Sequence, residues 1–313
     1  MTVLRFVPGG RKILAGETSV LDLTLRSWQL QTAVENPQRE KKYPMLLPIR
    51  TSGANPPLFI VHGLNGIMAI GYFLADMLPP DRPLYAINAI GLDGRETKNI
   101  IKVEDMALTY VEEIIEARPS GPLLVAGLCT GSLVAIEVVR ELQARGREVG
   151  PVILIDPPTV PPGYFQHNQT IDPRAPLVAA RLYQQVRTQL AYFTAKNGNY
   201  MPFAAEDQKK LHLATLAGVN CLASLSTYVP KVFPGTATAI LSFDRAAGFF
   251  HPEMYWIKLL PGRPFTQVLS YNHYSIFRAG RRELVRSLEF VLSFALDSKS
   301  HPGHAAEGAL TSA

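Results

Sequence analysis

One cysteine stands at a spacing that is typical of an enzymatic nucleophile. The stretch from 123 to 139 reads as an apolar run, then Gly-Leu-Cys-Thr-Gly at 127–131, then an amphipathic helical pattern. In a nucleophile elbow, a sharp strand-to-helix turn exposes the central side chain, and its neighbours two positions away must be small. The N-terminus of the following helix favours the thiolate of Cys129 over its thiol. The pattern therefore predicts Cys129 as a nucleophile and the Thr130 N–H as half of an oxyanion hole.

The cysteine content limits other interpretations. The alternative for Cys129 is an inert thiol packed at a turn. Cys221 lies in a helical pattern among apolar residues, where we expect a structural thiol. Two cysteines are too few for a disulfide framework or a structural zinc site, and we expect no metal.

A nucleophilic thiol needs a base, and one of the seven histidines is placed to supply it. His273 follows the last apolar run of the chain and precedes its last helical pattern. In an open α/β sheet, the loops at the carboxyl ends of the strands face the crevice where ligands bind. The order of nucleophile, acid and histidine also matches that of hydrolases. We therefore predict His273 as the general base, with a loop histidine bonded to backbone as the alternative.

Two aspartates are candidates for orienting that histidine, because both end apolar runs at the same expected edge of the sheet. Asp156 ends the run after the nucleophile's helix, and Asp244 ends the next run. Spacing slightly favours Asp244, because the acid most often follows that later strand in hydrolases. The residues alone leave both open, and the alternative for either is a turn or helix-cap aspartate.

Apolar runs and helical patterns alternate along most of the chain. Helical faces fall at residues 106–115, 133–142 and 281–296. Apolar runs bounded by Pro or Gly predict buried strands at Leu58–His62, Leu84–Ala89, Leu123–Leu128, Val152–Asp156, Ala237–Phe243 and Phe265–Ser270. The alternation predicts an α/β fold with a mostly parallel central sheet flanked by helices on both faces.

One long interval interrupts this alternation. Residues from about 157 to 234 contain no convincing strand but carry two amphipathic patterns. The interval is too long for a connector, so we expect a helical lid over the carboxyl edge of the sheet. The chain is thus expected to consist of an N-terminal arm (1–48), a catalytic domain (49–297) and a flexible tail (298–313).

Composition and charge limit the partners. The chain has 313 residues, of which 47% are hydrophobic and 18% charged, so it can bury a large core and is not of the disordered class. The net charge of +5 is mild and scattered, which does not favour nucleic acid as a partner. The start shows no secretory signal, and residues 211–229, although uncharged, are too polar to span a membrane. We expect a cytoplasmic protein.

Taken together, the motifs resemble a thioesterase domain of the α/β-hydrolase fold, as found with nonribosomal peptide and polyketide synthases. The segments that carry the resemblance are PPLFIVHGLNG (56–66), PLYAINAIGLDG (83–94), GPLLVAGLCTGSLVAIEVVRELQARG (121–146), PVILIDPP (151–158) and YNHYSIF (271–277). The resemblance implies a role in natural-product biosynthesis, such as that of antibiotics. It implies no cofactor beyond the phosphopantetheine that carries the substrate. The sequence departs from the family pattern in using Cys where Ser is commoner.

The resemblance also bears on the site residues. In the integrated synthase thioesterases, the acid follows the strand after the nucleophile's helix, in segments similar to LIDPP, and this position is Asp156. In stand-alone editing thioesterases the acid comes one strand later, which corresponds to Asp244, so the resemblance favours Asp156. The family's second oxyanion donor corresponds to the backbone N–H of Leu64.

The partners follow from the same resemblance. No carrier-protein, condensation or adenylation segment accompanies the motifs, and we expect a free-standing enzyme that meets an acyl or peptidyl carrier protein in trans. Many aromatic residues in the lid suggest a hydrophobic acyl group. The N-terminal arm has two possible roles: it could cover a hydrophobic face of the domain, or it could form a homodimer.

With cysteine as the nucleophile, the acyl-enzyme would itself be a thioester and would stay activated. We therefore hypothesise acyl transfer to an amine or hydroxyl, ring closure included, as well as hydrolysis. Two rival interpretations remain. One is a hydrolase similar to dienelactone hydrolases, which also use Cys in an elbow but lack a long helical insertion. The other is a non-catalytic acyl-binding module of the same fold.

Overall fold

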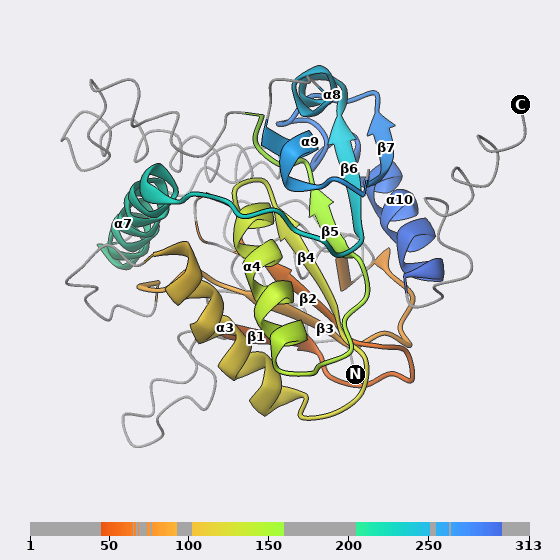
Figure 1. Cartoon of the computed structure of the whole chain (residues 1–313). Helices are drawn as coiled ribbons and strands as arrows, with labels where there is room; N and C mark the ends of the chain where they lie inside the picture. Colours follow the sequence, from red (N-terminus) through yellow and green to blue (C-terminus); the bar gives the residue numbers. More distant parts are fainter. Residues whose placement is uncertain are drawn as a thin grey trace, which may run out of the picture.

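The computed structural model describes residues 45–64, 66, 68, 74–75, 77–92, 102–159, 205–250, 255–262 and 264–295. Within these residues one sheet is formed by β1 (Leu46–Arg50), β2 (Leu58–Val61), β3 (Leu84–Ile87), β4 (Leu124–Leu128), β5 (Val152–Ile155), β6 (Ala237–Ser242) and β7 (Phe265–Leu269). The spatial order is β1-β3-β2-β4-β5-β6-β7, and only the β1–β3 pair is antiparallel (Figure 1). The predicted mostly parallel α/β sheet is confirmed.

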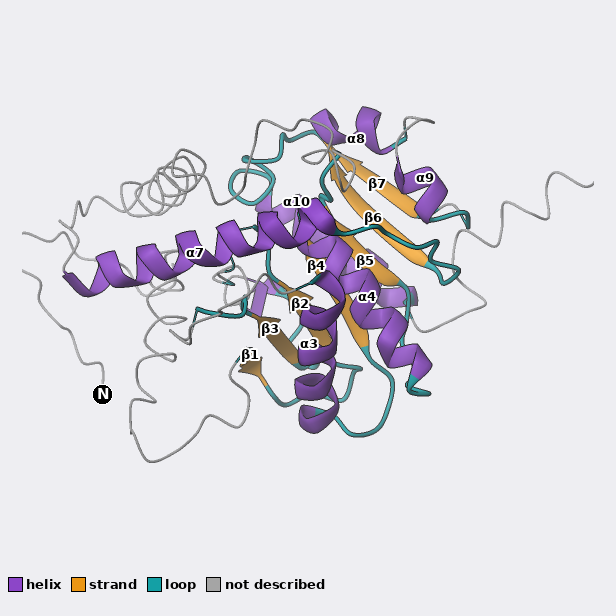
Figure 2. Ribbon diagram, turned by 60° about the vertical axis from the view of Figure 1, so that its left-hand side comes forward, coloured by secondary structure: helices purple, strands orange, loops and turns teal. Residues whose placement is uncertain are grey.

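The helices of the described part connect these strands, except the last, which follows β7. They are α3 (Val103–Ala117), α4 (Gly131–Ala144), α7 (Ala205–Thr227), α8 (Phe243–Phe249), α9 (Tyr255–Leu259) and α10 (Arg281–Phe294). Figure 2 shows them distributed around the sheet. None of the helices in the described ranges is both long enough and apolar enough to cross a bilayer.

The first strand of the sheet was not expected from the sequence. β1 lies at the edge of the sheet and extends across residue 48, where the arm was expected to end. Pro48 hides the strand from sequence analysis, because proline cannot donate to a ladder and is tolerated only at sheet edges and bulges. The pairing with β3 indeed shifts register between Pro48 and Arg50.

Other expected segments lie mostly outside the described residues. These are the arm up to residue 44, the tail, and residues 160–204 of the lid, which include most of its aromatic side chains. Within the described part of the lid interval, α7 occupies the second amphipathic pattern.

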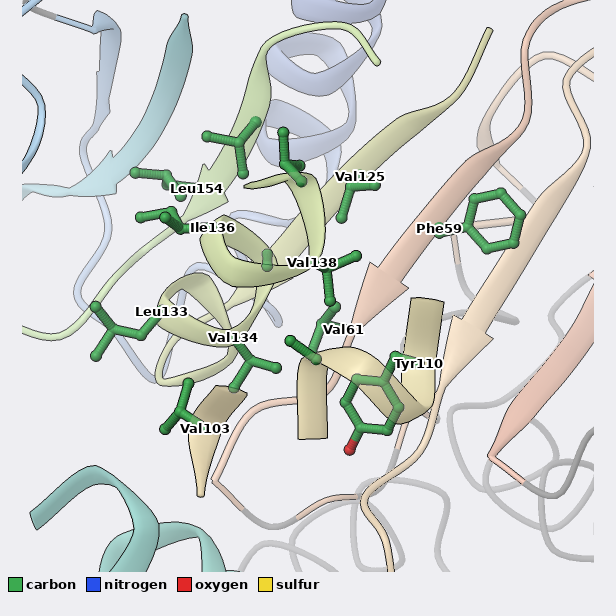
Figure 3. Close-up of a cluster of buried hydrophobic side chains, with 14 of the residues drawn as sticks. Phe59, Val61, Val103, Tyr110, Val125, Leu133, Val134, Ile136, Val138 and Leu154 are labelled. Atoms are coloured by element: carbon green, nitrogen blue, oxygen red, sulfur yellow. The ribbon is translucent and has the colours of Figure 1, made fainter. Parts of the chain in front are cut away.

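Each face of the sheet has its own core, which is why the strands read as continuous apolar runs. In β2, Phe59 and Val61 belong to the cluster with α3 and α4, whereas Leu58 and Ile60 belong to the cluster with α10. All four side chains are fully buried. Figure 3 shows the first cluster, in which side chains of the strands meet those of α3 and α4. Burial contributes about 1.5–3 kcal/mol for each such side chain, so the sheet is a firm base for its loops.

The topology fixes where a ligand can bind. β2 lies between β3 and β4. The connection after β2 therefore leads to the strand on one side of it, and the following connection leads to the strand on its other side. Ligand crevices in open α/β sheets lie outside the carboxyl ends of the strands at such a switch point. The loop after β2 and the turn after β4 both lie at this edge.

Candidate active site

A tight turn joins β4 to α4 and carries Cys129. Cys129 has φ 49°, in the left-handed region that costs a non-glycine residue of order 1–3 kcal/mol. Two backbone hydrogen bonds hold it there. Its N–H donates to the carbonyl of Ile155 at 2.8 Å, and its own carbonyl accepts from the N–H of Ser132 at 3.0 Å. The strained residue is therefore fixed from both sides.

The two glycines around this turn are required by contact. A Cβ atom at Gly127 would lie 2.4 Å from the carbonyl oxygen of Gly131. A Cβ at Gly131 would lie 2.0 Å from the carbonyl oxygen of His62, in the loop after β2. No side chain fits at such distances, so the Gly-x-Cys-x-Gly spacing has a direct steric cause. The short distance between Gly131 and His62 also shows that the loop after β2 packs against the turn.

His273 reaches the turn from the loop after β7. Its side chain is within hydrogen-bond reach of Cys129, and its Nδ1 lies 2.5 Å from Oδ2 of Asp156. Asp156 follows β5, is fully buried and has φ 50°. Its other oxygen accepts hydrogen bonds from the N–H and the hydroxyl of Ser242, at 2.8 and 2.7 Å. The carboxylate is thus held rigidly while it faces the imidazole.

Asp244 occupies a different place relative to the same histidine. It is exposed, and its Oδ1 accepts a hydrogen bond from the backbone N–H of His273 at 3.1 Å. Asp244 therefore contacts the backbone of the loop, whereas Asp156 contacts the imidazole ring. Ser242, which sequence reasoning missed, carries no motif signal apart from its place at the end of β6.

Sequence reasoning also missed an arginine next to the sulfur. Nη1 of Arg245 lies 3.5 Å from Sγ of Cys129 and 2.5 Å from the backbone carbonyl of Asp156. Its Nε lies 3.7 Å from Oδ2 of Asp156. The available signal was a cation directly after Asp244, two residues beyond the end of β6, at the edge where the crevice was expected.

The charges of these groups stabilise one another. Burial alone would raise the pKa of the Cys129 thiol, but the hydrogen bond from His273 and the charge of Arg245 outweigh it, so the pKa is lowered. For His273, burial alone would lower the pKa, but the hydrogen bonds to Asp156 and Cys129 outweigh burial and raise the pKa to about 9. For Asp156, burial raises the pKa, and bonds from His273 and Ser242 more than compensate and lower it. The arrangement favours a thiolate beside an imidazolium.

The two expected oxyanion donors lie in segments next to Cys129, namely the loop after β2 and the residue that follows the nucleophile. A Cβ at Gly63 would lie 3.7 Å from Cβ of Cys129, so the loop that contains Leu64 runs beside the nucleophile. Within the part of the chain that the structure describes, the N–H groups of Leu64 and Thr130 donate no hydrogen bond. N–H groups without an acceptor among the described residues suit a developing oxyanion.

A buried histidine anchors that loop. Nδ1 of His62 lies 2.7 Å from the carbonyl of Gly63, and because a carbonyl only accepts, Nδ1 carries the proton. Nε2 of His62 then accepts from the hydroxyl of Tyr110 at 2.8 Å. Burial lowers the pKa of His62 to about 4, so the ring stays neutral at pH 7. His62 therefore serves structure, although its position before Gly63 could have suggested a catalytic base.

The second cysteine, Cys221, is buried, whereas Cys129 is partly exposed. Cys221 lies in α7, and burial raises the pKa of its thiol to about 12. This environment is what an inert structural thiol requires. Among the described residues, no three His, Cys, Asp or Glu side chains gather as metal ligands do.

A mostly parallel sheet with a strand–turn–helix elbow at its carboxyl edge defines the α/β-hydrolase class. Residues 56–212, half of the chain, match the thioesterase domain family. The chain belongs to this family.

Curated relatives contain a similar stretch within much longer proteins. The chain is 34% identical over 167 residues to malpibaldin synthetase of Mortierella alpina, covering 48% of this chain and 3% of that protein. It is 35% identical over 112 residues to a dimodular nonribosomal peptide synthase of Bacillus subtilis (strain 168), covering 36% and 5%. The chain thus spans only a small part of the length of these relatives.

Solved structures agree on the fold. The NocB thioesterase domain, in a covalent complex with a fluorophosphonate nocardicin G analogue, superposes with TM-score 0.59 at 20% identity, covering 79% of this chain and 99% of that one. The thioesterase domain that cyclises the lipopeptide antibiotic surfactin gives TM-score 0.57 at 17% identity, covering 82% and 97%.

Proposed function

We propose that this thioesterase-family protein releases or transfers an acyl group from a thioester through an acyl-Cys129 intermediate. The observation that carries the proposal is the chain of contacts from Cys129 to His273 to the buried Asp156. In it, Cys129 is the nucleophile, His273 the acid and base, and Asp156 the group that orients the imidazole. Asp244 positions the loop of His273 through its backbone.

In the first half-reaction, the thiolate of Cys129 attacks the acyl carbonyl of the substrate. The N–H groups of Leu64 and Thr130 stabilise the oxyanion. The bond from the carbonyl carbon to the leaving sulfur breaks, and the imidazolium of His273 gives its proton to that sulfur. The products are a free thiol, a neutral His273 and an acyl thioester on Cys129.

In the second half-reaction, neutral His273 takes a proton from the acceptor as the acceptor attacks the acyl-enzyme. The acyl–sulfur bond breaks, and the thiolate and the imidazolium are restored. The acyl-Cys bond is a thioester like the substrate, so the intermediate retains its reactivity toward amines and hydroxyls. We propose transfer to such acceptors, including ring closure, alongside hydrolysis.

The proposed substrate is a hydrophobic acyl group bound to phosphopantetheine on a carrier protein in nonribosomal peptide or polyketide biosynthesis. Support comes from the relatives, which are synthetases that include a nonribosomal peptide synthase. The same site would accept a coenzyme A thioester, because the reacting atoms are identical.

Release of free thiol from acyl-pantetheine thioesters tests the proposal. We expect the wild-type chain to release thiol at a rate that Cys129→Ala reduces to background, while Cys221→Ser leaves it nearly unchanged. Cys129→Ser forms an oxygen ester in place of a thioester, so with an added amine we expect a higher ratio of hydrolysis to transfer. Equal thiol release by Cys129→Ala would overturn the acyl-Cys mechanism, and an unchanged product ratio in Cys129→Ser would overturn the transfer role.

A further inference from the structure

The environment of the Cys129 sulfur holds one more cation than a nucleophile–base–acid arrangement needs. Arg245 is the third residue of α8, and its side chain is only 18% exposed. Nη1 contacts both Sγ of Cys129 and the backbone carbonyl of Asp156. An arginine stays protonated throughout the working pH range, so this positive charge is permanent.

The position of the guanidinium does not depend on the sulfur. Nη1 donates to the carbonyl of Asp156 at 2.5 Å, and Nε faces the carboxylate of the same residue at 3.7 Å. Asp156 is in turn fixed by Ser242 and by its strand. The cation is therefore held in place before, during and after any change at Cys129.

The local charge balance indicates what Arg245 is for. Around the sulfur stand the carboxylate of Asp156, the imidazolium of His273 and the guanidinium of Arg245. When Cys129 is a thiolate, two negative and two positive charges cancel. Without Arg245, the buried carboxylate and thiolate would share a single imidazolium, and burying the excess negative charge is costly. His62 and Cys221 do not alter this balance, since burial keeps both neutral.

We propose that Arg245 is a catalytic residue that stabilises the Cys129 thiolate, both as the attacking nucleophile and as the group that leaves when the acyl-enzyme is resolved. The second role rests on the proposed acyl-Cys129 mechanism. In that step the acyl–sulfur bond breaks, its electron pair stays on the sulfur, and the proton of the acceptor goes to His273. The sulfur thus regains its negative charge 3.5 Å from Nη1 of Arg245. A good leaving group keeps the acyl-Cys reactive toward weak acceptors.

Titration of the thiolate tests the first role without any substrate. We would follow the ultraviolet absorbance of the thiolate against pH in wild-type, Arg245→Gln and Arg245→Lys proteins carrying Cys221→Ser. A charge at this distance in a partly shielded site predicts that Arg245→Gln raises the midpoint by about one pH unit or more, which is about a tenfold fall in the ionisation constant of the thiol. Arg245→Lys, which keeps the charge, should move it less. Arg147→Gln is the matched control, because Arg147 also binds two carbonyls, those of Arg118 and Gly121, away from the site.

A double-mutant comparison separates this role from a merely structural one. If Arg245 acts on the sulfur, Arg245→Gln lowers kcat by about tenfold or more with Cys129 but by much less in the Cys129→Ser background. If it only supports Asp156, the two losses are equal, and the proposal is overturned. An unchanged titration midpoint in both Arg245 variants also overturns it. If Arg245→Gln raises the thiolate midpoint as expected but the protein with native Arg245 forms no acyl adduct, the proposed function alone is overturned.

Discussion

Replacing Asp156 by Asn removes one charge from the site while leaving most of the local packing in place. The side-chain oxygen of Asn can keep the two hydrogen bonds from Ser242, but its NH₂ group then faces Nδ1 of His273. An NH₂ group only donates, so the imidazole must present a lone pair at Nδ1 and carry its proton on the side of Cys129. The histidine is then in the wrong tautomer to accept a proton there.

The size of this effect can be bounded. The contact with Asp156 is the largest of the interactions that raise the pKa of His273 to about 9. In a Ser–His–Asp enzyme, the same change of acid to amide lowers kcat by about 10⁴-fold. Because the thiolate here is already favoured by Arg245, we expect a fall of about 10³–10⁴-fold in kcat/KM, or about 4–5.5 kcal/mol of transition-state stabilisation.

The assay is thiol release against pH, with Asp244→Asn as the matched control. The amide oxygen of that Asn still accepts the backbone N–H of His273, so we expect less than about a tenfold loss. In Asp156→Asn the alkaline limb of the profile should also move to lower pH, because the imidazolium loses the carboxylate that retains its proton. A larger loss in Asp244→Asn than in Asp156→Asn would refute the assignment of the acid.

Two further predictions concern the turn and the sulfur. Gly131→Ala places a Cβ against the carbonyl of His62, so we expect the free energy of unfolding, measured by urea titration, to fall by about 1–3 kcal/mol or more. Gly262→Ala is the control, because the space around Gly262 is open, and it should change the free energy of unfolding by less than about 0.5 kcal/mol. Similar losses in the two variants would contradict the steric explanation. Iodoacetamide should alkylate Cys129 at pH 7 about tenfold faster than an ordinary thiol, with the rate falling on acidification as the thiolate gains a proton. The rate should be the same in Cys221→Ser, and a midpoint near that of a free thiol would contradict the lowered pKa of Cys129.

β2, β3 and β5 could be predicted from the sequence because each is buried on both faces and therefore hydrophobic at every position. β7 is mostly half-buried and contains polar residues, so its prediction rests on the apolar residues at its ends and on the proline that precedes it. The Cys129 turn could be anticipated because steric contacts leave glycine as the only residue at 127 and 131. By contrast, β1 was hidden by Pro48 at the sheet edge. The features that a sequence displays most clearly are thus those set by local sterics and burial.

The surroundings of the sulfur were less accessible to sequence reasoning. Spacing slightly favours Asp244 but does not decide between it and Asp156, because both follow strands that end at the same edge. The difference lies in the left-handed backbone at Asp156 and in the two donors of Ser242, which appear only once the strands are paired. Arg245 acts across β5 and β6, and the reach of a long side chain over neighbouring strands has no signature in spacing.

The most direct test of the central claim is intact-protein mass spectrometry after rapid mixing with acyl-pantetheine thioesters of different chain length. We expect a mass increase equal to one acyl group, located by peptide mapping on the peptide that contains Cys129 and absent in Cys129→Ala. We also expect an added amine to remove the adduct. An adduct on another residue, or turnover of the thioester by Cys129→Ala at the wild-type rate, would show that Cys129 does not carry the acyl group.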